Sequence, residues 1–369
     1  MEIVPYAPQQ HRDAVIALNA RFAEAGYVYQ LPTDPPETRS PKPAVWAEDF
    51  VAVEGDQVFG GYHLKHQAFF IDGQPVELGY LQLPLSLGLL DRKYANVSTG
   101  LIFDVIHRSE NLYCLGMGSQ QNTIVRILEA AGWKHLVVPF LFSVKSPNAF
   151  ARNIQLPPDR ARLQQAMRLA GAARLAGPAL WLQKRLRRSK PSGPRGAYDE
   201  AQVVPRLDDV AEPLFDNCRS EYALLADRSR DALDCLYPER KTHFIRLIVL
   251  RRSHVIGWAI LLDSHMTGHK YFGNMRVGSI ADCFACPNHA PDVMAAADDT
   301  LTRRGVDLVV SNQMHPAWRD ALERAGYQHG PSNFFFYFSP AFAERLGRAT
   351  DWDRRVHINR GDGDGPIHL

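Results

Sequence analysis

The chain has 369 residues, of which 46% are hydrophobic and 10% aromatic, and this excludes an intrinsically disordered protein. A formal net charge of +2 excludes a strongly basic protein that binds polyanions over its whole surface. No apolar run reaches transmembrane length and the first residues do not resemble a secretory leader, so a cytoplasmic protein is predicted.

The first part of the chain alternates helix and strand signals. A helix is predicted over 11–25, followed by a loop over 31–43, where five prolines disfavour helix and sheet. Further along we predict strands over 50–53, 58–71 and 76–89, a helix over 99–108, a strand over 112–116, a helix over 123–131 and a strand over 135–144. These elements make up an N-terminal domain over residues 1–150.

A basic helical linker is predicted over residues 151–200. Between Arg160 and Arg195 there are ten Lys or Arg and no Asp or Glu, interleaved with leucines. This pattern is typical of basic amphipathic helices. The segment is interpreted either as a linker with solvated arginines or as a contact for a membrane surface, with RNA as a less favoured partner.

The remaining elements repeat the order of the first domain. We predict a helical region over 219–225, strands over 244–251, 255–262 and 278–285, a helix over 293–304, a strand over 306–311, a helix over 316–325 and a strand over 333–338. They form a C-terminal domain over residues 201–345. The tail, 346–369, is rich in Gly, Asp and Arg and is expected to be disordered.

A short repeat supports a duplication. Residues 128–135 read LEAAGWKH and residues 322–329 read LERAGYQH, with five of eight positions identical and corresponding positions 194 residues apart. Each copy follows an apolar strand and a short helix and is followed by another strand. Two related α/β units are therefore predicted.

The cysteines do not suggest a disulfide framework. Five is an odd number, and several of them lie in apolar runs, so buried reduced thiols are expected. Cys283 and Cys286 have the spacing of a metal knuckle, but no second pair completes four ligands. No metal site is predicted.

The order of elements in both copies resembles the GNAT superfamily of acyl-CoA-dependent N-acyltransferases. Each copy has a helix, a meander of antiparallel strands, then helix, strand, helix and strand, with Gly and an aromatic after the last helix. The resemblance covers nearly the whole chain outside the linker and tail. It implies an α/β (α+β) class with two tandem GNAT-like domains, each a mixed, mostly antiparallel sheet flanked by helices.

The resemblance also implies a site for acetyl-CoA or another acyl-CoA. In the family, a loop of pattern Q/R-x-x-G-x-G/A after the fourth strand binds the diphosphate through amides at a helix N-terminus. The corresponding stretch of the first copy, 89–102, matches only in its last glycine. The implied binding residues are Leu89, Asn96, Ser98, Thr99, Gly100 and Asn122. Alternatively, Ser98 or Thr99 only caps the helix.

The second copy is expected to lack this site. Its stretch 286–297 contains no glycine, and Pro287 and Pro291 remove amide donors. The first copy is therefore predicted to bind the acyl donor.

Catalytic residues are less well defined by the resemblance. The tyrosine that protonates the departing thiolate in many members falls on Leu128 here and on Leu322 in the second copy, so the acid is either solvent or a different residue such as Tyr113 or Tyr80. The candidate bases are Glu77 and Asp282, with His63 and His66 on the strand before Glu77. Asp282 lies in an apolar run and needs a partner if buried, for which Arg276, His265 and His269 are candidates.

The resulting functional prediction is transfer of an acyl group to an amine on a small molecule or glycan, such as an amino sugar or a cell-envelope or exopolysaccharide precursor. Two alternatives stay open. One is a Fem-like transferase that uses aminoacyl-tRNA, and the other is an inactive scaffold or membrane-surface adaptor. The expected location is the cytoplasm, or the periphery of the inner membrane surface.

Overall fold

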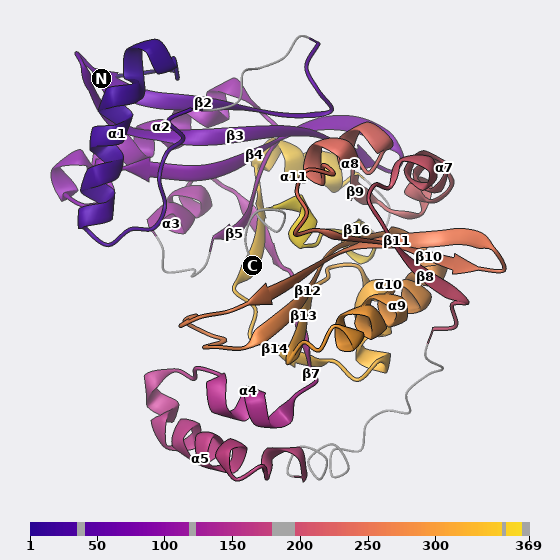
Figure 1. The fold of residues 1–369 in the computed structure, drawn as a ribbon. Helices are drawn as coiled ribbons and strands as arrows, with labels where there is room; N and C mark the ends of the chain where they lie inside the picture. The colour runs from indigo at the N-terminus through magenta and orange to yellow at the C-terminus, as the bar shows by residue number, and fades with distance from the viewer. Residues whose placement is uncertain (35–40, 118–122, 179–195, 349–351, 364–369) are drawn as a thin grey trace. The chain divides into compact units, whose positions relative to one another are not determined.

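A computed structural model describes residues 1–34, 41–117, 123–178, 196–348 and 352–363. The chain divides into two compact units (Figure 1). Unit 1 comprises residues 1–137, 224–227 and 333–352, and unit 2 comprises 138–223, 228–332 and 353–369. The predicted class, two tandem units with mixed and mostly antiparallel sheets, is confirmed.

Unit 1 is built on a sheet of order β1-β2-β3-β4-β5-β15-β6, in which β4 and β5 are the parallel pair. Its elements are β1 (Glu2–Pro5), α1 (Pro8–Glu24), β2 (Val45–Glu54), β3 (Gln57–Ile71), β4 (Gln74–Ser86), η1 (Leu87–Leu89), η2 (Arg92–Tyr94), α2 (Ala95–Arg108), β5 (Leu112–Met117), α3 (Thr123–Ala130), β6 (Lys134–Val137), β9 (Leu224–Ala226), β15 (Phe334–Phe338) and α11 (Pro340–Leu346). Apolar side chains of α1 cover one face of the sheet, and those of α2 and α3 cover the other.

Unit 2 repeats this plan in a sheet of order β14-β7-β13-β12-β11-β10-β8, with β12 and β13 as the parallel pair. Its elements are β7 (Phe140–Val144), α4 (Pro147–Asn153), η3 (Pro158–Arg160), α5 (Ala161–Ala172), β8 (Glu200–Val204), α7 (Asp208–Cys218), η4 (Arg219–Glu221), α8 (Arg230–Leu236), β10 (Ile245–Arg251), β11 (His254–His265), β12 (Arg276–Ala285), η5 (Pro287–His289), α9 (Ala290–Arg303), β13 (Leu308–Asn312), α10 (Pro316–Arg324), β14 (Gln328–Gly330), β16 (Val356–His357) and η7 (Arg360–Asp362).

The two repeats exchange one strand. The strand predicted over 135–144 is interrupted at Pro139, which lacks the amide that a continuous ladder needs. Of the two pieces, β6 stays in the sheet of unit 1, whereas β7 pairs with β13 and β14 in unit 2. Reciprocally, β15 from the second repeat lies between β5 and β6. Unit 1 therefore ends at Val137 and resumes at Asn333, because each sheet is completed by a strand of the other repeat.

Two further predictions are corrected. The region predicted as helix over 219–225 contains η4 and β9, and the helix of this part is α7. The tail expected to be disordered is ordered over 352–363, since Val356, Ile358 and Asp362 are at most 1% exposed. Asn359 and Asp362 close a capping box around η7. Residues 364–369 lie outside the described part.

The expectation of reduced cysteines is wrong for one pair. Cys218, the last residue of α7, forms a disulfide with Cys286, which follows β12. Cys114 and Cys283 are buried thiols, and Cys235 is exposed. The bond ties two elements of unit 2 across 68 residues, a loop length at which a crosslink removes substantial entropy from the unfolded chain.

Candidate functional site

The parallel strands of unit 1 separate after two paired positions. Their ladder consists of the pairs Gly79–Leu112 and Tyr80–Tyr113. Shortly beyond, Leu83 and Pro84 of β4 stand opposite one residue of β3, Tyr62, because Gln82 pairs with His63 and Leu85 pairs with Gly61. This β-bulge bends β4, and bulges commonly mark functional sites. The separation of β4 and β5 therefore follows from the short ladder between them and from the bulge in β4.

The connection from β4 to α2 leads to a helix start without an acidic residue in its first turn. Within η2, the carboxylate of Asp91 accepts the amide of Lys93 at 3.0 Å, and its carbonyl accepts the amide of Tyr94. The amide of Ala95 donates to the carbonyl of Arg92. The three amides directly before the helix interior are thus already hydrogen-bonded within the chain.

The predicted donor-binding residues are not all at this helix start. Because α2 begins four residues earlier than predicted, Asn96 and Ser98 lie in its first turn. The Ser98 hydroxyl is paired with that of Ser86 at 2.5 Å, which ties the end of β4 to the helix. Gly100 lies in the second turn, where an added Cβ meets only Met1 and Ile3.

The other predicted donor residues are spread along the same part of the chain. Thr99 follows Ser98 in α2, and Leu89 ends η1 with 39% of its surface exposed. Asn122 lies outside the described residues.

One glycine of this connection was missed by sequence reasoning. A Cβ on Gly88 would lie 2.7 Å from the carbonyl oxygen of Tyr94 and 2.8 Å from the hydroxyl oxygen of Ser98. Only glycine lets η1 pack this closely against the start of α2. The signal in the sequence is its position two residues after the end of β4.

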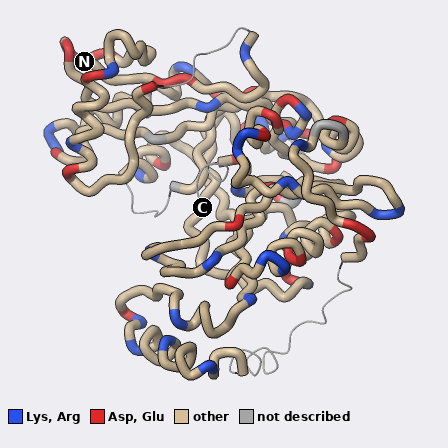
Figure 2. The backbone as a smooth tube through the Cα atoms, in the orientation of Figure 1, with Lys and Arg blue, Asp and Glu red and all other residues tan. Residues whose placement is uncertain are grey.

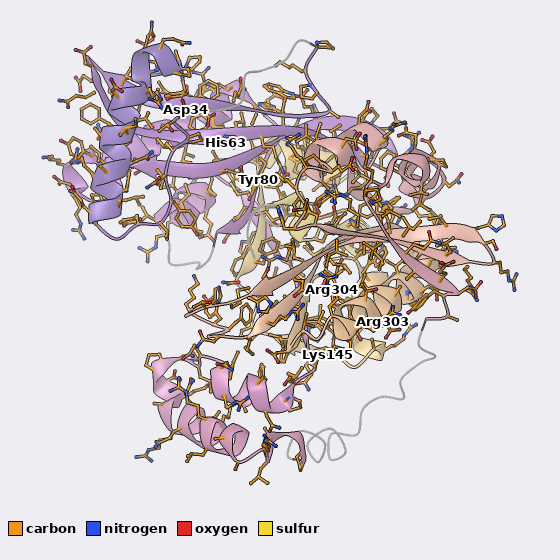
Figure 3. The ribbon with its side chains drawn as sticks, viewed as in Figure 1. Asp34, His63, Tyr80, Lys145, Arg303 and Arg304 are labelled. Carbon is orange, nitrogen blue, oxygen red and sulfur yellow. A yellow bond between two sulfur atoms is a disulfide. The ribbon has the colours of Figure 1, made fainter. Side chains whose placement is uncertain are left out.

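A histidine–carboxylate pair lies next to the bulge. His63 of β3 pairs in register with Gln82, the last β4 residue before the bulge. Its Nδ1 lies 2.8 Å from a carboxylate oxygen of Asp49 on β2, and the side chains are 22% and 9% exposed. Figure 3 shows His63 and Tyr80 on the neighbouring strands β3 and β4. An oriented imidazole with partial access to solvent is a suitable general base.

This pair lies on the α1 face of the sheet. Leu31, from the connection after α1, packs on Gly61 two residues before His63. Farther along that connection, the hydroxyl of Tyr6 donates to the carbonyl of Thr33 at 2.7 Å. Burial raises the pKa of Tyr6, and the neighbouring carboxylates of Asp34 and Asp49 add to this. The connection between α1 and β2 thus runs past the pair, and Tyr6, which precedes α1, is bound to it through Thr33.

The two catalytic candidates predicted in unit 1 lie elsewhere on the sheet. Glu77 is three residues before Tyr80, and its carboxylate, 66% exposed, is 3.3 Å from Nδ1 of His66. His66 alternates with Leu64, which packs on α2, so Glu77 and His63 are on opposite faces. Tyr113 is fully buried and stacks on Tyr80. The structure does not bring Glu77 and Tyr113 together.

In unit 2 the corresponding helix start is occupied by the chain itself. Asp292, in the first turn of α9, is 4% exposed and accepts the amide of Ala197 at 2.7 Å. Its other carboxylate oxygen is 3.3 Å from both Arg251 and His289. Gly196 packs so closely on Pro291 that a Cβ would lie 2.1 Å from its carbonyl oxygen. An internal carboxylate therefore takes the place that an anion would need.

The opening between the parallel strands of unit 2 is filled by the C-terminal segment, residues 356–362. The β12–β13 ladder ends at Ile280–Ser311, and a bulge on β12 precedes Asp282. Beyond β13, the amide of Met314 donates to the carbonyl of Ile358 at 3.0 Å. A Cβ on Gly361 would lie 2.5 Å from the carboxylate of Asp282, so the segment packs directly against β12.

Asp282 is fully buried, as predicted, but its partners are not the predicted ones. It accepts hydrogen bonds from Tyr237 at 2.7 Å and from Asn359 at 2.9 Å. The guanidinium of Arg228 lies 3.0 Å from Asp282 and also binds Asp362. Burial opposes the charge of Arg228, but the two carboxylates outweigh it and raise the pKa of the guanidinium. This network locks the C-terminal segment in place.

Of the predicted partners of Asp282, Arg276 instead forms an ion pair with Asp263 at 2.8 Å. His269 accepts backbone amides of its own turn through Nδ1. Asp282 therefore has a structural role in unit 2.

Two buried histidines make unit 2 sensitive to acid. Burial, reinforced by Arg355 and Arg319, lowers the pKa of His315 from 6.5 to about 4. Burial and then Arg228 and His315 lower the pKa of His357 well below 6.5. Below about pH 6.5 these two histidines bind protons in the unfolded chain but not in the folded chain. The free energy of unfolding that they contribute is therefore fully present above about pH 6.5 and is lost as the pH drops toward 4.

We expect His315→Asn to weaken this acid sensitivity. Asparagine keeps an acceptor for the amide of Ala317, which His315 caps at 3.2 Å, but it does not titrate. At pH 4 the loss in free energy of unfolding should shrink by roughly 3 kcal/mol relative to wild type. Urea unfolding at pH 7 and pH 4 measures this. The exposed His254, replaced by Asn, is the control; an equal acid response in His315→Asn and wild type would contradict the expectation.

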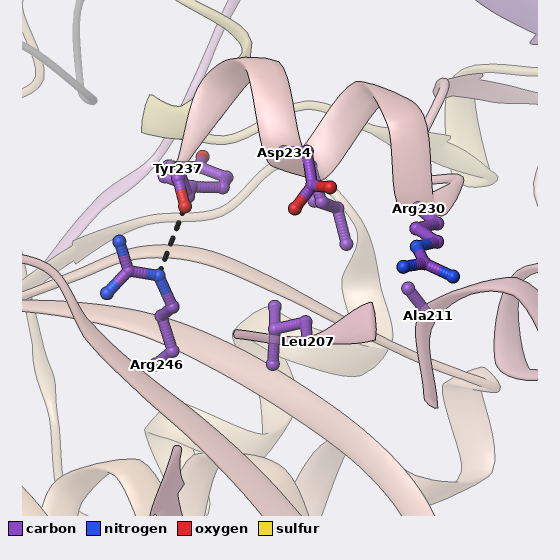
Figure 4. Close-up of a pocket in the computed structure, with 7 residues that line it drawn as sticks. Leu207, Ala211, Arg230, Asp234, Tyr237 and Arg246 are labelled. Atoms are coloured by element: carbon purple, nitrogen blue, oxygen red, sulfur yellow. Dashed lines mark hydrogen bonds between the residues drawn. The ribbon is translucent and has the colours of Figure 1, made fainter. Parts of the chain in front are cut away.

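A small pocket of unit 2 carries no evident chemistry. Its cavity of about 10 Å³ is lined by Leu207, Ala211, Arg230, Leu233, Asp234, Tyr237 and Arg246 (Figure 4). The guanidinium of Arg246 donates to four carbonyls, including those of Tyr237 and Pro238. Its donors are used to hold the turn before β10, which makes the pocket structural.

Among the known proteins, similar ones were found by comparison of structures and not by comparison of sequences. No protein-family model matches the sequence, and no curated protein matches it. Among solved structures, the chain is similar to Saccharomyces cerevisiae N-myristoyltransferase with bound myristoyl-CoA, with 11% identity, 97% of this chain and 88% of that chain covered, and a TM-score of 0.52.

Two further solved structures are similar. A conserved protein of unknown function from Enterococcus faecalis, described as a probable N-acyltransferase, matches with 8% identity, 92% and 73% coverage and a TM-score of 0.50. A tandem GNAT protein from the clavulanic acid biosynthesis pathway matches with 12% identity, 92% and 98% coverage and a TM-score of 0.45. At such identities the similarity concerns the fold.

Proposed function

We propose that this chain, which has the tandem fold of the GNAT superfamily, transfers an acyl group from an acyl-CoA to an amine, and that unit 1 is the active unit. The contrast between the units carries the proposal. In unit 1 the strands separate beside an oriented histidine and an acid-free helix start. In unit 2 the same two places are taken by the C-terminal segment and by Asp292.

The acyl donor would bind along β4 with its diphosphate at the start of α2. The positive end of the helix dipole favours an anion there. Asn96, Ser98 and Thr99 belong to this turn or follow it, and Arg92 and Lys93 add positive charge just before it. Because Gly100 faces β1, its replacement would test packing on Met1 and Ile3 and not anion binding.

Asn96→Glu should separate donor binding from folding. The exposed carboxylate would complement the helix dipole, so the fold is retained, but it would repel a diphosphate. We expect the Kd for acetyl-CoA in isothermal titration to rise at least tenfold, about 1.4 kcal/mol, with Asn96→Gln close to wild type. If wild type binds no acyl-CoA of any chain length, the proposed function fails and an inactive scaffold becomes the better interpretation.

In the reaction, the amine nitrogen attacks the thioester carbonyl carbon held in the opening after Tyr80. The amine proton passes to His63, directly or through one water, while Asp49 orients the imidazole through Nδ1. The carbon–sulfur bond then breaks and the CoA thiolate takes a proton from solvent, because the predicted donor Tyr113 is fully buried against Tyr80. Backbone amides of β4 beyond Tyr80 would stabilise the oxyanion of the intermediate.

The acceptor would approach on the α1 face, where the connection after α1 passes His63. This connection exposes Tyr27, Val28 and Tyr29 and also carries Asp34, a combination that suits a hydroxylated amine such as an amino sugar. A panel of amino sugars, polyamines and peptides, with released CoA thiol as the readout, identifies the acceptor class. No described contact favours aminoacyl-tRNA as the donor.

The helical hairpin α4–α5 supports the proposed contact with an anionic membrane surface. In and just after α5, Leu163, Leu169 and Leu175 are 50–65% exposed. Arg162, Arg168 and Arg174 are exposed beside them, and Figure 2 shows this positive charge along the hairpin. Apolar and cationic side chains exposed together are typical of helices that lie on membranes. No described helix is long and apolar enough to cross a membrane.

Replacement of Arg162, Arg168 and Arg174 by alanine should lower the fraction of protein that floats with vesicles containing anionic lipid at least tenfold, since each basic side chain near such a surface contributes about 1 kcal/mol. Neutral vesicles and high salt should give the same loss for wild type. Replacement of three exposed arginines elsewhere, Arg21, Arg240 and Arg324, serves as the charge-matched control. Equal flotation of both variants would remove the membrane contact.

A further inference from the structure

We propose that Tyr80 closes the opening between β4 and β5 and restricts the acyl donor to short chains; this rests on the proposed function of unit 1. Tyr80 is the last β4 residue paired with β5. Its hydroxyl crosses to the neighbouring strand and donates to the carbonyl of Leu115, two residues beyond Tyr113, at 3.0 Å. The phenol therefore spans the base of the opening on the α1 face.

The ring of Tyr80 is held rigidly. It stacks on Tyr113 with 4.8 Å between ring centroids and 13° between planes, and Nζ of Lys65 lies 5.0 Å from its centroid. Tyr113 in turn contacts Phe69 at 5.3 Å and Phe336 at 5.8 Å. Tyr80 is 2% exposed and the other three aromatic residues are fully buried. A packed aromatic cluster of this kind yields little space without a cavity or strain cost.

The opposite face of the opening is filled as well. Leu81 follows Tyr80 and points to the α2 face, where it joins Cys114 in one apolar core. Leu81 is 1% exposed and Cys114 is fully buried, and Val125 and Leu128 of α3 complete this core. Side chains thus fill the base of the opening on both faces of the sheet.

This packing limits the donor. A thioester carbonyl held by the β4 backbone beyond Tyr80 directs its acyl chain toward the base of the opening, where it meets the phenol. An acetyl group ends before that point, but each further methylene competes with the aromatic cluster for space. Mismatch of a single methylene in a fitted pocket changes kcat/KM by about 10–200-fold. The geometry therefore points to Tyr80 as the residue that determines chain length.

The test compares acetyl-, butyryl- and octanoyl-CoA with the full chain, measuring released CoA thiol in the presence of an amine that wild type acylates. Wild type should favour acetyl-CoA over octanoyl-CoA by at least a hundredfold in kcat/KM. Tyr80→Phe keeps the ring and should keep that ratio. Tyr80→Leu and Tyr80→Ala shorten the side chain and should shift the ratio at least tenfold toward octanoyl-CoA. Circular dichroism confirms that each variant is folded.

The outcomes separate the two proposals. A wild type that uses octanoyl-CoA as well as acetyl-CoA overturns the role of Tyr80 and leaves the proposed acyl transfer intact, whatever the variants do. An unchanged ratio in a folded Tyr80→Leu or Tyr80→Ala variant does the same. A wild type that transfers no acyl group and binds no acyl-CoA overturns the proposed function, and the role of Tyr80 falls with it.

Discussion

Replacement of Arg228 by methionine is expected to lower the free energy of unfolding by roughly 3–5 kcal/mol, the usual cost of removing one partner from a buried ion pair. Arg228 is fully buried and faces two fully buried carboxylates, Asp282 and Asp362. Without the guanidinium, both would be left uncompensated in the interior. Burial raises the pKa of Asp362 even with Arg228 beside it. Loss of the guanidinium would therefore force Asp362 to bind a proton or the C-terminal segment to detach.

Urea unfolding followed by tryptophan fluorescence measures this effect, since Trp258 and Trp318 are buried in unit 2. Arg206→Met is the matched control, because its ion pair with Asp234 is about 40% exposed on both sides and should contribute less than about 1 kcal/mol. A triple variant that also changes Asp282 and Asp362 to asparagine should recover part of the loss. Equal stability of Arg228→Met and Arg206→Met would show that the buried network does not hold unit 2 together.

Replacement of His63 by glutamine is expected to lower kcat for acyl transfer by about 10²–10³, within the range for loss of a general base. Glutamine retains a polar side chain of similar length but cannot accept the amine proton. The Kd for acetyl-CoA should stay within about twofold, because His63 lies on the α1 face and the donor is proposed to bind at the start of α2. Asp49→Asn should give a smaller loss, since it removes the group that orients the imidazole.

Two variants show whether the effect belongs to His63. His107→Gln replaces an exposed histidine on α2 and should leave kcat unchanged. Glu77→Gln tests the base predicted from the sequence. A large loss in Glu77→Gln together with an active His63→Gln would reverse the assignment. If His63→Gln weakened acetyl-CoA binding as much as it lowered kcat, the result would indicate damage to the fold and not loss of the general base.

Local patterns predicted most of the elements. The strand over 58–71 and the helix over 123–131 were found within one residue because alternation and helical periodicity depend on neighbouring residues. The exchange of β7 and β15 could not be found in this way. Both strands follow the same repeated segment, so their local sequences are similar, and the choice of sheet depends on contacts far along the chain.

In the candidate site, too, the features set by neighbouring residues were predicted and those set by distant contacts were not. Burial of Asp282 followed from its apolar neighbours, but its partners Arg228 and Asn359 are 54 and 77 residues away. His63 was noted only as a neighbour of Glu77, because its pairing with Asp49 depends on the register of β2 and β3. The ordered tail was missed since composition describes the average segment, whereas Asn359 and Asp362 act through single contacts.

The strand exchange has a consequence for synthesis of the protein. The sheet of unit 1 receives β15 only when residues 334–338 have left the ribosome, although its other main strands end at Val137. Until then, β5 and β6 have unpaired edges on a nascent chain, which favours association with other chains. A fragment ending near residue 150 is therefore expected to aggregate, and chaperone binding during translation should persist until the last strand emerges.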